Sequence, residues 1–255
     1  MQPQQRGLPA YLAELIGTFL LVFVITSVVV LFVATGNQAQ FGSDFAVVGL
    51  AQGLALFGLV VIFRAASDGH FNPVVTLGAA AIRRIAPVDA LIYMLAQLSG
   101  GVLGALLCKG LLLDEGRATH YGAAEVTGLL GGNFQGSIVE ALGAFVLVLV
   151  VLVALYSKDG PKDWAPFAYG TTLAFLVMVG GPLTGGSFNP ARWFGPALVG
   201  NSWGGVWPYI VGPLVGAAVA VVVFKFVIEA AGGALGAPKR PASPKPAASK
   251  PGTPA

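Results

Sequence analysis

Charged residues are scarce in this chain of 255 residues: only 10% are charged, while 56% are hydrophobic. Soluble globular domains carry roughly 25% charged residues, which cover the surface that faces water. The scarcity excludes an ordinary soluble protein and indicates that most of the surface contacts a lipid bilayer. The basic residues flank apolar segments, so the small net charge of +3 reflects membrane topology and does not indicate a nucleic-acid partner.

Cysteine is also nearly absent. Cys108 is the only cysteine, which excludes an internal disulfide and a cysteine metal cluster. We expect no metal site and no cofactor. The first apolar run is long, contains Glu14 and follows Arg6, so it is interpreted as a membrane span and not as a cleavable signal peptide.

Long apolar segments fill most of the chain. A helix needs about 20 residues to cross the hydrocarbon core of a bilayer. Segments of about that length lie at 10–34, 45–66, 88–113, 136–157, 165–182 and 205–229. Two shorter apolar runs, 73–82 and 190–199, each follow an Asn-Pro pair. A helix of about 11 residues rises only about 16 Å, half of the core, so these runs are predicted to be re-entrant half-helices.

The two halves of the chain repeat one order of elements. Each has a span with an early glutamate (Glu14 or Glu140), a second span, an Asn-Pro half-helix and a third span. Three crossings per half is an odd number, so the second half must be inverted relative to the first. The sequence therefore predicts an all-α membrane protein, with six transmembrane helices and two re-entrant half-helices in an inverted repeat.

The boundaries and the orientation follow from the same reading. We expect a cytoplasmic N-terminus (1–9), a first repeat (10–113, half-helix 72–83), an extracytoplasmic connecting loop (114–135), a second repeat (136–230, half-helix 189–199) and a tail (231–255). The tail is rich in Pro, Ala, Lys and Ser and is predicted to be disordered. With both termini in the cytoplasm, Lys109 and Arg117 are the basic residues left outside, apart from Arg192 in the second half-helix. This asymmetry predicts a multi-pass protein of the plasma or inner membrane with both termini inside.

The triplet Phe-Asn-Pro occurs twice, ending at Pro73 and Pro190. Asn is a favoured N-cap, and Pro suits the first helical position. Two half-helices that enter from opposite faces bring together N-termini with about half a positive charge each. Asn72 and Asn189 then both offer side-chain N–H donors to a molecule at the centre. Such a site repels cations and orients a water molecule. Ordinary capped helices in loops are the structural alternative.

The segments around these triplets resemble the paired signature boxes of the aquaporins, the major intrinsic proteins. They read SDGHFNPVVT from Ser67 and GGSFNPAR from Gly185, and the resemblance covers about 8–230. The pore motifs would be Asn72, Pro73 and Val74 with Asn189, Pro190 and Ala191. The first box departs from the usual pattern, because Val74 replaces Ala and Ser-Asp-Gly-His replaces Ser-Gly-Ala-His. The resemblance implies a homotetramer with one pore per subunit.

By the same resemblance, an outer constriction would consist of Gln52, Val177, Gly186 and Arg192, with Arg192 as its cation. Strict water channels usually have an aromatic residue, a histidine and a small residue at the first three positions. We therefore expect a wider and less water-selective constriction, unless Gln52 folds toward Arg192 and narrows it. Alternatively, Gln52 joins two helices by hydrogen bonds, or Arg192 extends to the membrane interface.

Three further polar residues are expected to support the pore. By resemblance, Glu14 and Glu140 accept N–H bonds from the loops that lead to the half-helices; a proton relay is the alternative. His70 either forms structural hydrogen bonds or gates by protonation.

The predicted function is a passive channel in the lipid bilayer that conducts water and small neutral solutes while excluding ions and protons. A channel mainly for glycerol or another small neutral solute, such as a neutral metalloid acid, and a coupled secondary transporter are the alternatives. His70 and Ser187 suggest a serine hydrolase, but the Gly-Gly-Ser-Phe run lacks the second glycine of a Gly-x-Ser-Gly turn. We therefore expect no enzyme.

Overall fold

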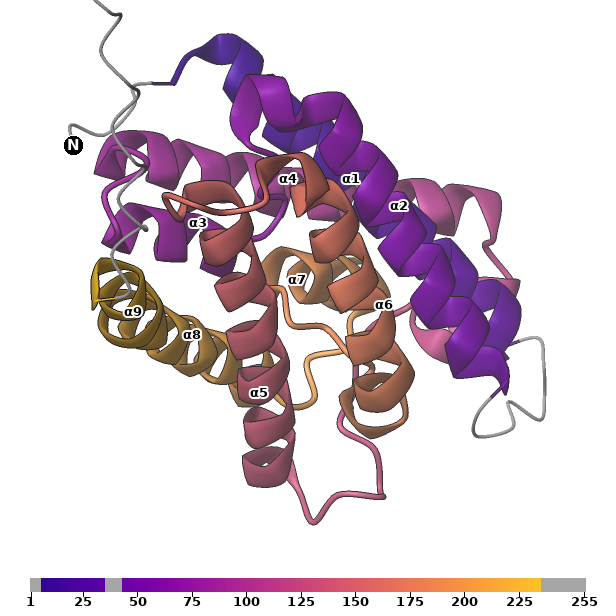
Figure 1. The fold of residues 1–255 in the computed structure, drawn as a ribbon. Helices are drawn as coiled ribbons and strands as arrows, with labels where there is room; N and C mark the ends of the chain where they lie inside the picture. The colour runs from indigo at the N-terminus through magenta and orange to yellow at the C-terminus, as the bar shows by residue number, and fades with distance from the viewer. Residues whose placement is uncertain (1–5, 35–42, 235–255) are drawn as a thin grey trace, which may run out of the picture.

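The computed structural model describes residues 6–34 and 43–234. Figure 1 shows short helices enclosed by longer ones. The helical elements in chain order are α1 (Leu8–Val29), η1 (Val30–Ala34), α2 (Ser43–Ser67), α3 (Pro73–Ala81), α4 (Pro87–Leu111), η2 (Glu115–Thr119), α5 (Asn133–Val151), η3 (Leu152–Tyr156), η4 (Lys162–Trp164), α6 (Ala165–Thr184), α7 (Pro190–Gly200), α8 (Val206–Val223), η5 (Phe224–Ile228) and α9 (Glu229–Ala234).

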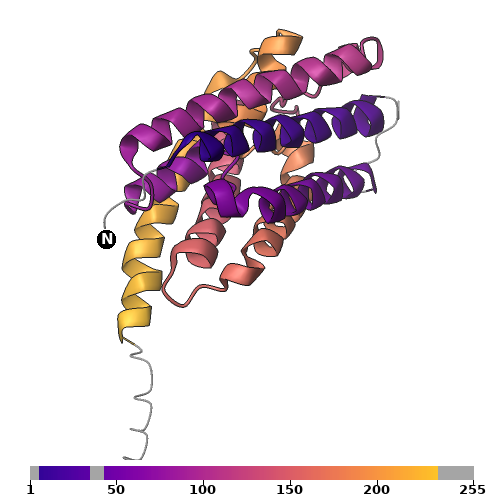
Figure 2. The same cartoon turned by 90° about the horizontal axis from the view of Figure 1, so that it is seen from above.

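Six helical segments of the described chain are long and apolar enough to cross a membrane. They are Leu8–Val33, Asp44–Ser67, Pro87–Leu111, Asn133–Tyr156, Lys162–Thr184 and Val206–Ala231. Three of them continue through a π-helical turn, namely η1, η3 or η5. Figures 1 and 2 place the start of α1 and helix α9 toward the same side of the molecule. An even number of crossings requires that arrangement.

The two short helices begin as their sequences dictate. Helix α3 starts at Pro73, and the Asn72 side chain accepts the backbone N–H of Val74 at 3.1 Å. Helix α7 starts at Pro190, and the Asn189 side chain accepts the N–H groups of Ala191 (2.9 Å) and Arg192 (3.3 Å). In each case the capping oxygen partners helix N–H groups that have no intrahelical acceptor.

Glycines allow the long helices to cross closely. A Cβ at Gly53 of α2 would lie 2.4 Å from the carbonyl oxygen of Gly170 in α6, and a Cβ at Gly170 would lie 2.5 Å from the oxygen of Gly53. A Cβ at Gly216 of α8 would lie 2.1 Å from the Ala141 oxygen of α5. Since lipid gives helices little hydrophobic drive to associate, such close contacts stabilise the bundle by van der Waals packing.

The inverted repeat is visible in equivalent side-chain contacts. The ring of Phe71 packs against Gly17 of α1, where a Cβ would lie 2.0 Å from the ring. The ring of Phe188 packs in the same way against Gly143 of α5, where a Cβ would lie 2.1 Å from the ring. Each phenylalanine directly precedes the capping asparagine of its half-helix. Both loops are therefore anchored on the first span of their own half.

The C-terminal end departs from its predicted boundary. Helix α9 continues to Ala234, past residue 231, where the disordered tail was expected to start. Residues 235–255, the rest of the predicted tail, lie outside the described residues.

Candidate functional site

The N-termini of the two half-helices meet at the centre of the molecule. The Asn72 amide donates from Nδ2 to the carbonyl oxygen of Phe188 at 3.0 Å. The Asn189 amide donates from Nδ2 to the carbonyl oxygen of Phe71 at 2.9 Å. Each amide has two N–H donors, so one N–H of each asparagine remains for a molecule beside them.

A narrow cavity adjoins both asparagines. It is lined by the polar residues Asn72, Asn189, Arg192, Tyr169 and Ser187, and by the apolar residues Leu21, Ile25, Leu56, Leu147 and Leu173. The space open to the centre of a water molecule is about 10 Å³. A cavity needs roughly 10–15 Å³ of such space to hold one water. The cavity therefore has room for about one water molecule, among polar groups and leucine and isoleucine side chains.

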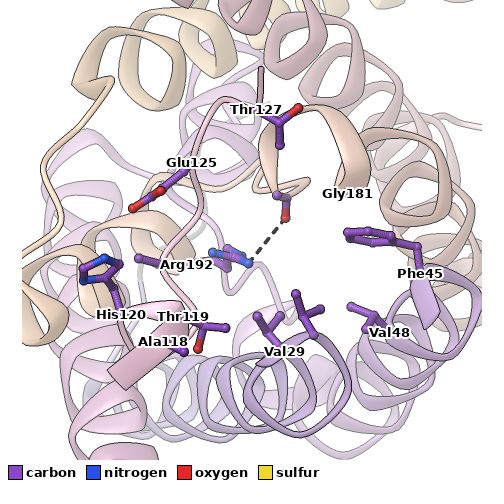
Figure 3. A pocket seen from close by; sticks show the side chains of 13 residues that line it. Val29, Phe45, Val48, Ala118, Thr119, His120, Glu125, Thr127, Gly181 and Arg192 are labelled. Atoms are coloured by element: carbon purple, nitrogen blue, oxygen red, sulfur yellow. Dashed lines mark hydrogen bonds between the residues drawn. The ribbon is translucent and has the colours of Figure 1, made fainter. Parts of the chain in front are cut away.

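A wider cavity of about 190 Å³ shares Arg192 with the narrow one. Figure 3 shows Arg192 between two walls of this vestibule cavity. Its polar wall includes Thr119, His120 and Glu125 from the connecting loop, and its apolar wall includes Val29, Val48 and Phe45. Arg192 therefore borders both cavities.

The guanidinium of Arg192 is held by carbonyl groups of two loops. Nη1 donates to the Gly122 oxygen at 3.2 Å, and Nη2 donates to the Gly185 oxygen at 3.4 Å. The residue is only 2% exposed, and its Nε has no partner among the described residues. A buried arginine is costly unless polar groups surround it. The two carbonyls offset part of that cost and fix the direction of the side chain.

Gly122 can hold this position because it lacks a side chain. Its φ angle is +79°, and a Cβ would lie 2.8 Å from the Cα of Thr26. The preceding residues His120 and Tyr121 also have positive φ angles, 46° and 55°. This turn brings the connecting loop down to Arg192. The sequence analysis gave the loop only a connecting role, and the run of three left-handed residues has no sequence signal apart from the glycine.

The other expected constriction residues, Gln52, Val177 and Gly186, are buried inside the bundle. Val177 is 0% exposed, and a Cβ at Gly186 would lie 3.4 Å from the Cα of Val177, so these two residues are neighbours. Gln52 is 1% exposed, and neither its Nε2 nor its Oε1 has a partner among the described residues. These three residues line neither the narrow nor the vestibule cavity, whereas Arg192 lines both.

Glu14 binds the loop that leads to α3. Its Oε1 accepts the Ser67 hydroxyl at 2.6 Å and the His70 backbone N–H at 2.9 Å. Its Oε2 accepts the Phe71 backbone N–H and the Gln97 amide, both at 2.7 Å. Glu14 is fully buried. One carboxylate thus satisfies two backbone N–H groups of a non-helical segment inside the bundle, where bulk water cannot serve as their acceptor.

Glu140 does the same for the loop that leads to α7. Its Oε1 accepts the Thr184 hydroxyl at 2.6 Å and the Ser187 N–H at 3.0 Å. Its Oε2 accepts the Phe188 N–H at 2.6 Å. One hydroxyl and two backbone N–H groups of the loop are bound in both halves, whereas the Gln97 amide at Glu14 has no counterpart at Glu140.

Both ring nitrogens of His70 have partners. Nδ1 lies 3.1 Å from the Thr76 hydroxyl, and Nε2 lies 2.7 Å from the Tyr156 hydroxyl. The Ser187 hydroxyl donates instead to the Asn189 carbonyl at 2.9 Å. His70 and Ser187 therefore do not form the nucleophile–base pair that the serine-hydrolase alternative required.

A polar cluster next to His70 was not predicted from the sequence. The Tyr156 hydroxyl also donates to Asp68 at 2.9 Å, and Asp68 forms an ion pair with Arg6. Asp68 has a φ of +68°, a conformation in which Asp is tolerated better than most residues. The position of Asp68 before a glycine is a weak sequence signal for this turn. Nothing in the sequence predicts its partners Arg6 and Tyr156, because they come from separate elements.

Comparison with known proteins assigns the chain to a family. The family model for the major intrinsic proteins matches residues 3–224. This chain belongs to the major intrinsic protein family. The "Glycerol uptake facilitator protein-like 6" of Lactiplantibacillus plantarum is 39% identical over 213 residues, 82% of this chain and 94% of that protein. The "Aquaporin TIP4-4" of Zea mays is 38% identical over 230 residues, 88% of each chain.

The X-ray structure of the aquaglyceroporin from Plasmodium falciparum matches the fold with a TM-score of 0.73 at 20% sequence identity. The match covers 86% of this chain and 96% of the other. The family predicted from the paired boxes and the all-α, aquaporin-like fold class are thereby confirmed. As a major intrinsic protein with six membrane-length helices, the chain is a multi-pass membrane protein.

Proposed function

We propose that this major intrinsic protein is a passive channel that conducts water and small uncharged solutes while excluding ions and protons. The observation that carries the proposal is the reciprocal pair of bonds from Asn72 to Phe188 and from Asn189 to Phe71. It fixes two helix N-termini and two amide donors beside a cavity with room for about one water molecule.

Cations are repelled at this point. Each helix N-terminus carries about half a positive charge, and here both point at one place. Together they repel a cation about 4 Å away with a Coulomb energy of roughly 4 kcal/mol at an effective dielectric constant of about 20. The fixed charge of Arg192 adds a second barrier at the mouth of the narrow cavity.

Protons are excluded by the orientation of the central water. When the free N–H groups of Asn72 and Asn189 both donate to one water, both of its lone pairs are occupied. That water cannot accept a proton from its neighbour, so a chain of waters is interrupted there. Uncharged molecules lose nothing by this arrangement.

By family resemblance, Gln52, Val177 and Gly186 select the solute together with Arg192, which is the one of the four that lines the two cavities. Val177 is aliphatic and Gly186 has no side chain, so these two positions supply neither an aromatic ring nor a histidine; Phe45 and His120 line the vestibule cavity instead. This composition supports passage of solutes larger than water. A channel mainly for glycerol or a similar neutral solute is the second candidate, favoured by that same lack of bulk.

Coupled transport is less well supported. A proton relay needs carboxylates that can release and rebind protons, whereas Glu14 and Glu140 each accept several loop donors. Family membership and the separation of His70 from Ser187 also support a non-enzymatic protein. We further propose a homotetramer in the plasma or inner membrane, with both termini in the cytoplasm and the vestibule cavity facing outward.

Stopped-flow light scattering on proteoliposomes tests the proposal. Vesicles shrink under an impermeant osmolyte and swell again as a permeant solute enters. We expect faster shrinkage than in protein-free vesicles. We also expect swelling when small neutral solutes are present, at a rate that a proton gradient does not alter. Unchanged shrinkage contradicts the channel. Uptake against a solute gradient that depends on protons supports the transporter instead.

A further inference from the structure

A basic pocket lies at the end of the molecule where α9 is found, away from the proposed pore. It has a volume of about 250 Å³ and is lined by Ile82, Arg83, Arg84, Lys225 and Glu229. Three cations thus face one carboxylate. The pocket joins the turn after the half-helix α3 to the π-helical turn η5 and the start of α9, which lie on the same side in Figure 1.

Two of the cations are held in place by the protein itself. Lys225 donates from Nζ to the Ala81 oxygen at the end of α3, at 3.3 Å. Arg84 donates from Nη2 to the Tyr156 oxygen at 2.6 Å, and its guanidinium carbon lies 5.7 Å from the centre of the Tyr156 ring. The Lys225 ammonium carries three N–H donors and uses one of them in its bond to Ala81. Ordered cations bind an anion with less loss of side-chain entropy than free ones.

Arg83 stands at a backbone position that disfavours its side chain. Its φ is +60°, a left-handed conformation that glycine adopts without strain. A helix end of this type usually has glycine. The backbone N–H groups of Arg83 and Arg84 close α3 by bonds of 2.9 Å to Ala80 and Ala79. The bonds that end α3 therefore come from the backbone and do not require an arginine side chain. Arg83 places an exposed cation at this position despite the strained backbone conformation.

The surface beside the pocket is apolar. Phe226 is 73% exposed, Val222 is 54% exposed and Val227 is 56% exposed. All three belong to the membrane-length segment Val206–Ala231, which also contains Lys225. A cation pocket next to exposed apolar side chains of a membrane-length helix matches a ligand with an anionic head and hydrocarbon tails. A free anion would use only half of this surface.

We propose that Arg83, Arg84 and Lys225 bind the phosphate of an anionic phospholipid, with its acyl chains against Val222 and Phe226. Basic pockets between membrane helices are known to recognise such head groups. Glu229 opposes a second negative charge near the phosphate, so a head group with one net charge fits better than one with several. The site is separate from the pore and does not depend on which solute the channel conducts.

Native mass spectrometry of the full-length protein tests this site. The protein is equilibrated with phosphatidylglycerol or phosphatidylcholine in detergent, and the bound lipid is counted. The test variant is R83A/K225A; Arg84 is kept because it braces Tyr156. The matched control is R117A/K158A, which removes two exposed cations elsewhere. Each basic residue near an anionic lipid surface raises the affinity about fivefold. The affinity of the test variant for phosphatidylglycerol should therefore fall about 25-fold.

The control should retain phosphatidylglycerol as the unmodified protein does, and phosphatidylcholine should bind weakly throughout. Equal retention of phosphatidylglycerol by R83A/K225A and the control overturns the proposal. Two more measurements separate a lipid from a soluble anion. Loss of bound lipid in the variant Phe226→Ser supports a lipid site. Displacement of the lipid from the unmodified protein by millimolar inorganic phosphate refutes the lipid site in favour of a soluble anion. Unchanged water permeability of R83A/K225A shows that it is folded.

Discussion

Replacing Glu140 by glutamine tests how the second half-helix is held in place. The carboxylate accepts three donors: the Thr184 hydroxyl, the Ser187 N–H and the Phe188 N–H. A glutamine amide keeps the shape but has only one oxygen. If that oxygen faces Thr184 and Ser187, the amide N–H₂ group faces the Phe188 N–H, and two donors oppose each other.

The expected loss follows from this count. One buried N–H left without an acceptor costs about 1–3 kcal/mol. The two remaining bonds lose their charge, which lowers each by about 1 kcal/mol. The total is about 3–5 kcal/mol, or a fall in Tm of roughly 10 °C for a chain of this size. The Phe188 carbonyl, which accepts from Asn72, should shift as well, so water permeability per molecule should fall.

Thermal unfolding in detergent and stopped-flow water permeability measure the two effects. Glu14→Gln should destabilise at least as much, because its amide N–H₂ group would then oppose the donors of Phe71 and Gln97. Glu115→Gln is the control, since this glutamate is exposed in η2 and lines neither cavity. A Tm for Glu140→Gln within about 1 °C of the unmodified protein, with full permeability, refutes the reasoning.

Three further substitutions test other parts of the site. Arg192→Ala removes the fixed charge between the two cavities, so glycerol entry measured by light scattering should rise; an unchanged solute profile excludes Arg192 from the constriction. Gly122→Ala places a Cβ 2.8 Å from the Thr26 backbone and should destabilise by about 1–3 kcal/mol, seen as a lower Tm with a broader solute profile. Gly17→Ala puts a Cβ 2.0 Å from the Phe71 ring and should lower Tm by a similar energy of about 1–3 kcal/mol; an unaltered Tm would mean that the loop moves freely.

The sequence predicted those features that depend on local chemistry. Asn72-Pro73 and Asn189-Pro190 mark two helix starts because the capping oxygen and the fixed φ of proline act within one turn. The membrane spans follow from the length of apolar runs. The pairing of Glu14 and Glu140 with their loops was reached only by resemblance, since nothing in the local sequence says which donors a buried carboxylate meets.

The parts that escaped prediction depend on contacts between distant segments. The Gly122 carbonyl reaches Arg192 through a turn of left-handed residues, and hydrophobic periodicity does not report such a turn. The cluster of Arg6, Asp68 and Tyr156 joins three elements that are far apart in the chain. In both cases a polar residue acquires its role from the bundle around it and not from its neighbours in sequence.

The central claim is that the paired half-helices pass water and stop protons. Proteoliposomes that contain the protein and an entrapped pH-sensitive dye allow both fluxes to be measured on one preparation, under an osmotic gradient and then under a proton gradient with potassium and valinomycin present. The account predicts water permeability well above that of protein-free vesicles, with a proton flux equal to theirs. A proton flux that rises together with water permeability would contradict it.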